Sequence, residues 1–176
     1  MPLIRGRHNG RAAVATVAIV DAAKYKEHKQ SDNPVFQGAV PFRALIDTGA
    51  TRTMIASRVV VRLGLQQVNK IEFSGLGGSV WRPGYLFHVG FYTSTPANSA
   101  EISRIRVLKR EINGGELLDE HTFDVLLGMD VLTTGNLHIG KDGTFRFLFG
   151  EWAIPYAYSR RGAIADDVAC MNRFSG

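Results

Sequence analysis

Short apolar runs separated by turn-forming residues make up most of the chain, and apolar residues at helical spacing are rare. The apolar or alternating runs cover residues 12–21, 35–47, 71–74, 79–91, 102–108, 123–127, 137–139 and 144–149. Alternation with a period of two, and short apolar runs bounded by turn signals, are typical of β-strands. The pattern therefore predicts an all-β protein, mainly β with one or two short helices.

Two short segments have features of helices. Residues 54–64 contain Ser57 as a candidate N-cap and Gly64 at the expected stop, and a second short helix is predicted directly after Gly128. Hydroxyl side chains satisfy free N–H groups at a helix start, and glycine accepts the backbone angles at a helix end. Residues 24–34, in contrast, are polar and rich in turn formers, which predicts an exposed loop.

Two pairs of predicted strands are joined by glycine-containing turns and are expected to form hairpins. The segments 71–74 and 79–91 flank the tip Gly-Leu-Gly-Gly at residues 75–78, and Lys-Asp-Gly joins 137–139 to 144–149. The tip lacks the Lys-Ser/Thr of a phosphate-binding loop and the third glycine of a dinucleotide fingerprint, so we reject both. Three glycines suit a mobile lid, although a plain flexible turn has the same composition.

The length of 176 residues fits one domain with a substantial core. We predict an N-terminal arm at residues 1–11, the folded domain at 12–150 and a C-terminal extension of unknown structure at 151–176. Residues 12–20 are apolar but short, interrupted by Thr16 and without Leu or Phe. They resemble a first strand more than a signal peptide, and we therefore expect a cytoplasmic protein.

Composition and charge argue against several classes of partner. The net charge is +5, but the basic residues are scattered, without a basic stripe or an aromatic platform, so we expect no nucleic acid. No apolar run reaches the length of a membrane span, so we expect no membrane partner. Cys170 is the single cysteine and the five histidines lack ligand spacing, so we expect no intrachain disulfide and no metal.

The stretch that most suggests chemistry is Ala-Leu-Ile-Asp-Thr-Gly-Ala-Thr at residues 44–51. An apolar run, read as a buried strand, delivers the Asp47 carboxylate at its end, and Gly49 permits a sharp turn. A carboxylate at such a corner is partly desolvated yet reachable, which suits acid–base chemistry. Taken alone, the same residues also fit an ordinary Asp-Thr-Gly turn.

Three features in order carry a family resemblance: the strand with Asp-Thr-Gly, the glycine-tipped hairpin, and the apolar strand, glycine and short helix at residues 125–132. In this combination residues 12–149 resemble the retropepsins, the retroviral-type aspartic proteases. The resemblance implies a closed, β-rich acid protease barrel. It also implies an aspartic endopeptidase that needs no cofactor and whose active site is shared between two subunits.

The sequence supports a shared site independently, because it contains Asp-Thr-Gly only once. Peptide hydrolysis of this type uses two carboxylates that share one proton, one as base on a water and the other as donor to the carbonyl oxygen. One motif in each chain therefore requires a two-fold homodimer with Asp47 from each copy at the axis.

Site residues follow from the resemblance, position by position. Asp47 corresponds to the catalytic carboxylate, Thr48 to the threonine that hydrogen-bonds across the dimer axis, and Gly49 to the residue that approaches carboxylate and substrate. Ala50 lacks the hydroxyl that some relatives carry there, which predicts a less acidic pH optimum. The substrate-binding residues are expected to be Ala50, Thr51, Leu76, Gly77, Gly78, Leu127 and Gly128.

The chain also departs from the retroviral pattern. Retroviral enzymes often carry an acidic residue at the position of Thr51 and a basic one at that of Met129, and both are absent here. Arg52 and Asp130 are candidates for a substitute ion pair. Retroviral dimers are sealed by interleaved chain termini, whereas the arm and the tail of this chain differ from theirs.

Two other interpretations remain open at this point. The same dimeric groove could hold a peptide without cutting it, as a binding module or assembly scaffold. Alternatively, Asp47 could be the covalent nucleophile of a phosphotransferase, although Thr51, Arg52 and Thr53 follow where such enzymes generally carry a further Asp or Lys.

Overall fold

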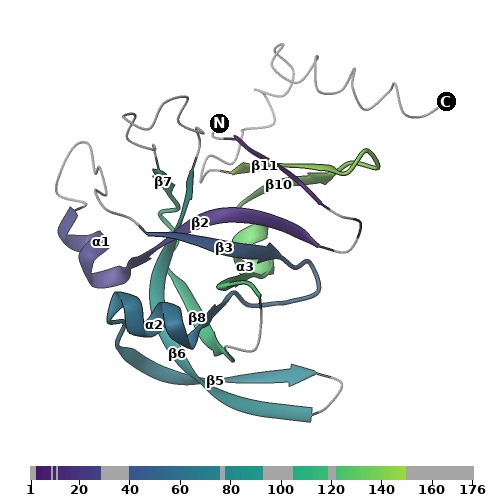
Figure 1. Ribbon diagram of the computed structural model, residues 1–176. Helices are drawn as coiled ribbons and strands as arrows, with labels where there is room; N and C mark the ends of the chain where they lie inside the picture. Colours follow the sequence, from purple (N-terminus) through teal and green to yellow (C-terminus); the bar gives the residue numbers. More distant parts are fainter. Residues whose placement is uncertain are drawn as a thin grey trace, which may run out of the picture.

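The computed structural model describes residues 3–8, 10, 12–28, 40–75, 78–92, 105–118 and 122–149. Eleven strands and three short helices lie in these ranges (Figure 1). In chain order they are β1 Leu3–Arg7, β2 Ala13–Asp21, α1 Ala22–His28, β3 Pro41–Ile46, β4 Met54–Ala56, α2 Ser57–Leu63, β5 Gln67–Gly75, β6 Gly78–Tyr92, β7 Ile105–Val107, β8 Ile112–Leu117, β9 Val125–Leu127, α3 Met129–Leu132, β10 Gly135–Ile139 and β11 Thr144–Phe149.

Six strands close into a barrel. Their order is β2–β3–β9–β4–β8–β6, and the ring closes because β6 also pairs antiparallel with β2, from Val17 opposite Phe91 to Asp21 opposite Phe87. The pairs β3–β9 and β4–β8 are parallel. The predicted all-β fold with a closed barrel is therefore confirmed.

The barrel encloses the main core. Phe87, Val89 and Phe91 of β6 are fully buried and alternate with residues on the other face, as expected of a strand. They share one cluster with Ile55 of β4 and Val59 of α2. Burial of apolar side chains contributes about 25 cal/mol per Å² removed from water, so this cluster is a main source of stability.

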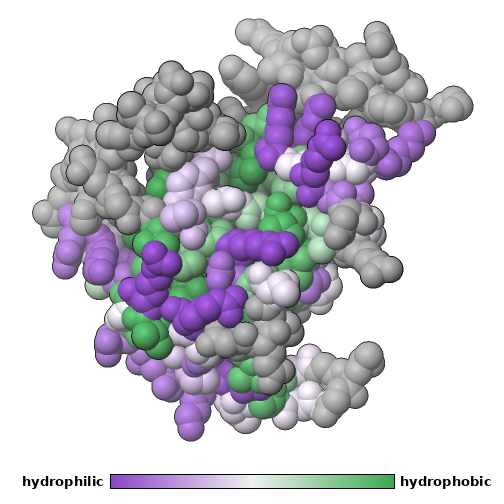
Figure 2. Space-filling view, viewed as in Figure 1, coloured by the Kyte–Doolittle hydropathy of each residue, from purple (hydrophilic) through white to green (hydrophobic). Residues whose placement is uncertain are grey.

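A second, three-stranded sheet has the order β1–β11–β10. Phe145, Phe147 and Phe149 alternate along β11, and each is only 1% exposed. Phe147 and Phe149 also contact Phe91 of the barrel through their rings, so the two sheets share a core. On the opposite face of this sheet, hydrophilic side chains gather over β1 and the β10–β11 hairpin, at the upper right of Figure 2.

The N-terminal segment predicted to be an arm contributes a strand to this sheet. Residues of β1 pair antiparallel with β11, from Leu3 opposite Leu148 to Arg7 opposite Thr144. The His8 ring bonds to the carbonyl oxygen of Gly140 at 2.8 Å and holds the end of β1 to the β10–β11 turn. This part of the arm therefore belongs to the folded body.

The helix predicted at residues 54–64 begins later than expected. Met54–Ala56 forms β4, and α2 starts at Ser57 with Ala56 as N-cap and no side-chain cap. Ser57 was therefore wrongly predicted as the N-cap, because its hydroxyl donates to the Glu116 carboxylate instead. The predicted stop is confirmed: Gly64 has φ of 65°, in the left-handed region, and its N–H reaches the carbonyls of Val60 and Val61.

The loop prediction for residues 24–34 is wrong at its start, because Ala22–His28 forms α1. Asp21 caps this helix, with its carboxylate accepting from the N–H groups of Ala23 and Lys24 at 2.9 and 3.1 Å. The Tyr25 ring stacks on the buried His88 of β6, with 3.8 Å between the ring centroids. A contact with a residue far away in the sequence therefore stabilises a helix that the polar composition of the segment did not predict.

The remaining predictions have mixed outcomes. The hairpin of β10 and β11, the β5–β6 hairpin, and β9 followed by α3 are confirmed. Residues 29–39, 93–104 and 150–176 lie outside the described residues, and with them the predicted C-terminal extension. No helix in the described ranges is long and apolar enough to cross a membrane.

Candidate active site

Asp47 follows the last residue of β3, a strand in the middle of the barrel wall. On one side β3 pairs with β2, where Ala13 lies opposite Ile46, and on the other it runs parallel to β9, where Leu127 lies opposite Ile46. The Asp47 N–H donates to the Leu127 carbonyl oxygen at 3.1 Å, which extends this pairing one residue past the strand. Two neighbouring strands therefore hold the backbone of Asp47 in place.

The Thr-Gly turn then orients the carboxylate. The Gly49 N–H donates to Asp47 Oδ1 at 2.9 Å, and the Ala50 N–H donates to the Asp47 carbonyl oxygen at 3.3 Å. A Cβ at Gly49 would lie 3.2 Å from Oδ1, so glycine permits this close approach. Asp47 is partly exposed and Thr48 and Gly49 are exposed, which leaves the carboxylate accessible to solvent.

Beyond the turn, the chain is tied to the start of α3. The Met129 N–H donates to the Ala50 carbonyl oxygen at 2.8 Å, and the Asp130 N–H donates to that of Thr51 at 3.2 Å. Gly128 lies against this backbone so closely that a Cβ on it would be 2.4 Å from the carbonyl carbon of Arg52. The Asp-Thr-Gly turn and the Gly128 segment therefore form one backbone unit.

Thr53 and Asp130 complete this unit. The Asp130 carboxylate accepts from the Thr53 N–H at 2.9 Å and from its hydroxyl at 2.7 Å. The Thr53 hydroxyl in turn accepts from the Gly128 N–H at 3.1 Å, and Thr53 is fully buried. The suggested Arg52–Asp130 ion pair is wrong: no ion pair joins the two in the described part of the chain, and Asp130 binds the backbone and hydroxyl of Thr53 instead.

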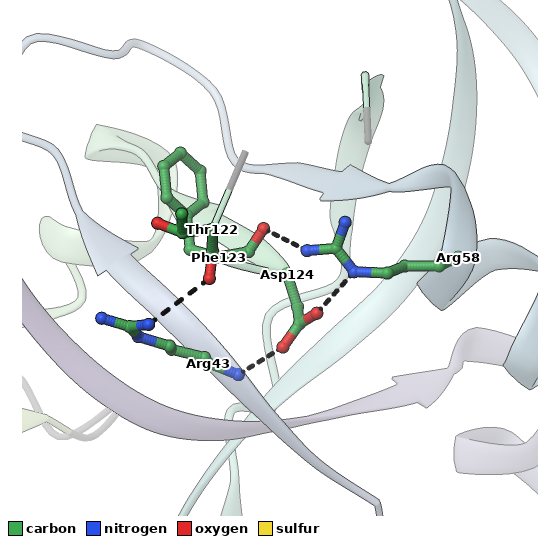
Figure 3. A network of polar contacts seen from close by, with 5 residues as sticks. All are labelled: Arg43, Arg58, Thr122, Phe123 and Asp124. Atoms are coloured by element: carbon green, nitrogen blue, oxygen red, sulfur yellow. Dashed lines mark hydrogen bonds and ion pairs between the residues drawn. The ribbon is translucent and has the colours of Figure 1, made fainter. Parts of the chain in front are cut away.

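A polar network around Asp124 holds the start of β9 beside β3 (Figure 3). Asp47 lies at the other end of β9, beside Leu127. The Asp124 carboxylate accepts from the Arg43 N–H at 2.8 Å and from Arg58 Nε of α2 at 2.8 Å. The Arg58 guanidinium also donates to the Phe123 carbonyl oxygen at 2.6 Å. Charged hydrogen bonds of this kind are stronger than neutral ones. The network therefore stabilises the register between β3 and β9, which places Leu127 next to Asp47.

A second polar cluster lies near the base of the long hairpin. Glu116 of β8 accepts from the Tyr85 hydroxyl at 2.9 Å and from Ser57 at the start of α2. Burial and this carboxylate raise the pKa of Tyr85 to about 12, so its hydroxyl keeps its proton. The cluster links β6, β8 and α2 where the hairpin leaves the barrel.

The long hairpin projects from the barrel at the bottom of Figure 1. Its strands β5 and β6 pair from Gln67 opposite Tyr85 to Gly75 opposite Gly78, with an irregularity between Gln67 and Asn69. Gly78 has φ of 101°, which favours glycine at the tip. The predicted substrate-binding residues Leu76 and Gly77 lie outside the described residues.

The other predicted substrate-binding residues occupy different surroundings. Ala50 and Thr51 follow the turn; Ala50 is partly exposed and Thr51 is exposed, whereas Gly128 is buried against Arg52. The Leu127 side chain is 1% exposed and belongs to the barrel core. Leu127 therefore supports Asp47 through its carbonyl oxygen, and its side chain points away from solvent.

An apolar groove of about 460 Å³ adjoins the turn. It is lined by residues of the turn, of α3 and its end, and of β10: Thr48, Met129, Leu132, Thr133, Gly135, Leu137 and Ile139. Among these groove residues, only Thr48 was predicted from the sequence as a site residue. The sequence predicted the short helix and the hairpin strand that carry the apolar groove residues, but no local signal indicates that these residues are exposed.

Within the described ranges, no three His, Cys, Asp or Glu side chains group in a way that could hold a metal ion. The titratable group at the turn is the Asp47 carboxylate. Next to it lie N–H donors, a threonine hydroxyl and the apolar groove. Such an arrangement can position a carboxylate for acid–base chemistry.

A β-barrel with Asp-Thr-Gly at the end of one of its strands is typical of the acid proteases. Comparison with known proteins supports this class. The model of the family described as "Aspartyl protease" matches residues 34–131. This span covers more than half of the 176 residues, and the chain belongs to this aspartyl protease family. No curated protein matched the chain.

Solved structures of similar proteins include a retropepsin-like aspartic protease from Rickettsia conorii. It is 14% identical, with 82% of this chain and 89% of that chain covered and a TM-score of 0.48. The retroviral protease-like domain of Ddi1 from Leishmania major is 15% identical, with 81% and 98% covered and a TM-score of 0.34.

Proposed function

We propose that the protein is an aspartic endopeptidase that hydrolyses peptide bonds between the Asp47 carboxylates of two copies of the chain. The observation that carries the proposal is the placement of Asp47. It follows a central barrel strand, its Oδ1 accepts from the Gly49 N–H, and its backbone is bonded to Leu127. Membership of the aspartyl protease family favours this reaction over a phosphotransferase.

One carboxylate is not sufficient for this reaction. The ionised Asp47 of one copy removes a proton from a water, whose oxygen attacks the carbonyl carbon of the peptide. The protonated Asp47 of the other copy donates its proton to the carbonyl oxygen, and a tetrahedral intermediate forms. As the C–N bond then breaks, the carboxyl that took the proton from water gives it to the leaving nitrogen, and the other carboxylate takes a proton from a hydroxyl of the intermediate, so that the pair again holds one shared proton.

The surrounding residues have roles in this proposal. Thr48 hydrogen-bonds across the two-fold axis and joins the two turns. Ala50 and Thr51 contact the substrate beside the catalytic pair, and the Gly128 segment supports them. The β5–β6 hairpin, with Leu76, Gly77 and Gly78 at its tip, closes over an extended peptide and excludes water.

The proposal is tested by incubating the protein with an unstructured polypeptide at several pH values. Asp47→Asn keeps the size of the side chain but removes the titratable group, and we expect a loss of cleavage of about 10²–10⁴-fold. The matched control is Asp142→Asn, in the exposed turn between β10 and β11, which is expected to cleave like the native chain.

Products are identified by mass spectrometry, so that a contaminating protease is recognised by its cleavage sites. Undiminished cleavage by Asp47→Asn would refute the proposal. Binding of the polypeptide without cleavage by the native chain at any pH would favour the alternative, a dimeric peptide-binding or scaffold module.

A further inference from the structure

The three-stranded sheet buries more of its inner face on β11 than on β10. Phe145, Phe147 and Phe149 lie opposite Ile139, Leu137 and Gly135, and cross-strand partners share a face of the sheet. Each phenylalanine is 1% exposed, but Ile139 is 51% exposed. The core-facing side of the sheet therefore continues onto β10, where the described residues leave Ile139 half exposed.

Leu137, Ile139 and Met129 form an apolar strip that continues to the active-site turn. Ile139 and Leu137 line the groove of about 460 Å³ together with Met129, which is 38% exposed, and Thr48. Thr48 directly follows Asp47. The apolar strip and the candidate catalytic residue therefore lie on the same side of the chain.

The outer edge of β10 is unpaired in the described structure. β10 bonds to β11 alone and is a terminal strand of the β1–β11–β10 sheet. An open strand edge beside exposed apolar side chains is a template for pairing with another strand. The other terminal strand, β1, carries the exposed Arg5 and Arg7, and a copy of β1 placed beside it would bring like charges together.

We propose that the β10 edge and its groove form the interface with a second copy of the chain. β10 pairs antiparallel with β10 of the partner, so that the two sheets, of three strands each, become one continuous sheet across the two-fold axis. Leu137, Ile139 and Met129 of each copy are then covered by those of the other. A two-fold axis generates this antiparallel arrangement, because the same patch serves both copies.

The choice of a second copy of the chain as the partner at the β10 edge rests on the proposed function, which places a second Asp47 next to the first. The axis must then pass close to Thr48, and Thr48 lines the uncovered groove. A partner that completes the catalytic pair therefore also reaches the β10 strip. The arrangement differs from a dimer sealed by interleaved termini, because β1 pairs with β11 of its own chain.

Ile139→Asp tests the interface, with Val61→Asp as its control. Val61 lies on α2 and is 81% exposed, so the control adds the same charge to a different surface. We expect sedimentation to show a dimer for the native chain and the control, and a dissociation constant raised at least about 100-fold for Ile139→Asp. Circular dichroism and thermal unfolding establish that the variants are folded.

Hydrogen exchange of the native chain gives a second measurement that does not depend on a variant. Amides of residues 135–139 are expected to become more protected as the concentration rises from monomer to dimer, whereas those of residues 3–7 stay unchanged. Protection confined to residues 3–7, protection of neither segment in a dimer, or an Ile139→Asp variant that dimerises like the native chain would each overturn the interface.

The outcomes separate the interface from the proposed activity. If the native chain dimerises through β10 but cleaves nothing, the interface stands and the endopeptidase fails. If Ile139→Asp is monomeric and still cleaves, the interface stands and the two-copy site fails. If Ile139→Asp is dimeric and cleaves, the interface fails and the endopeptidase stands.

Discussion

At the scale of single residues, Gly128 and Thr53 show how closely the candidate site is constrained. Gly128 passes the Arg52 backbone at a distance that admits no side chain, and its N–H is satisfied by the buried hydroxyl of Thr53. A buried donor that loses its partner costs about 1–3 kcal/mol, so these contacts matter for stability as well as for geometry. The site is held by atoms that do not themselves react.

Gly128→Ala is expected to destabilise the protein by up to about 3 kcal/mol, because its Cβ would lie 2.4 to 2.9 Å from three backbone atoms of Arg52. The Arg52 backbone cannot move aside as a flexible side chain can, because its neighbours Thr51 and Thr53 are hydrogen-bonded to Asp130. Denaturant unfolding measures the effect, and intact stability would contradict the packing described here.

The matched comparison is Gly49→Ala. Its Cβ would lie 3.2 Å from the terminal oxygen of a side chain, Asp47 Oδ1, which can shift slightly. We expect Gly49→Ala to unfold within about 1 kcal/mol of the native chain but to cleave substrate more slowly. The two variants thus separate support of the fold from orientation of the carboxylate.

At the scale of elements, an aromatic contact with a titratable group joins α1 to the barrel. His88 of β6 is 3% exposed, its Nδ1 bonds to the Leu108 carbonyl oxygen at 2.9 Å, and its ring stacks on Tyr25. Burial lowers the pKa of His88 from its ordinary value of 6.5, although the Leu108 bond opposes the shift. Charge on this ring therefore disfavours the folded state.

The sign of the pH dependence follows from this shift. Below pH 6.5 the unfolded chain protonates His88 while the folded chain does not, so the unfolded state binds more protons. Stability is expected to fall as the pH drops from 6.5 towards the lower folded pKa, by at most about 1.4 kcal/mol per pH unit for one proton.

His88→Phe removes the titration and keeps a ring to stack on Tyr25. Unfolding free energies measured from pH 7.5 to 5 are expected to show a flatter profile for this variant. A native slope that persists in His88→Phe would assign the acid sensitivity to other groups. The variant also loses the bond to Leu108, so its absolute stability is not the readout.

At the scale of the whole molecule, the proposed active site belongs to the pair of chains and not to one of them. In the described part of one chain, a single Asp47 lies beside the exposed apolar side chains of Met129 and Ile139. A symmetric partner supplies the second carboxylate and covers the strip at the same time. Catalysis and association are therefore expected to be lost together.

Mixing experiments test this coupling. Native chain mixed with an equal amount of Asp47→Asn is expected to lose about half of its activity, and with ninefold excess to keep about a tenth, because mixed dimers hold a single titratable Asp47. Mixing with Asp142→Asn is expected to leave the activity of the native chain intact. Activity unaffected by excess Asp47→Asn would show that one chain is sufficient.

Features that depend on near neighbours in the chain were predictable from the sequence. The Asp-Thr-Gly corner, the Gly64 helix end and the turn between β10 and β11 each follow from local backbone preferences and turn chemistry. The resemblance in three ordered segments extended these local signals to the family and to the closed barrel. Residues 151–176 remain a prediction of an extension without assigned structure.

Tertiary structure decided the features that join distant residues. Asp130 binds Thr53 although 77 positions separate them, and Tyr25 and His88 meet only because α1 folds onto β6. The sequence marks Leu137 and Ile139 as apolar, but their exposure depends on how far neighbouring elements extend over β10. Periodicity determines which face of a strand is apolar, whereas only the assembled sheet determines whether that face is covered.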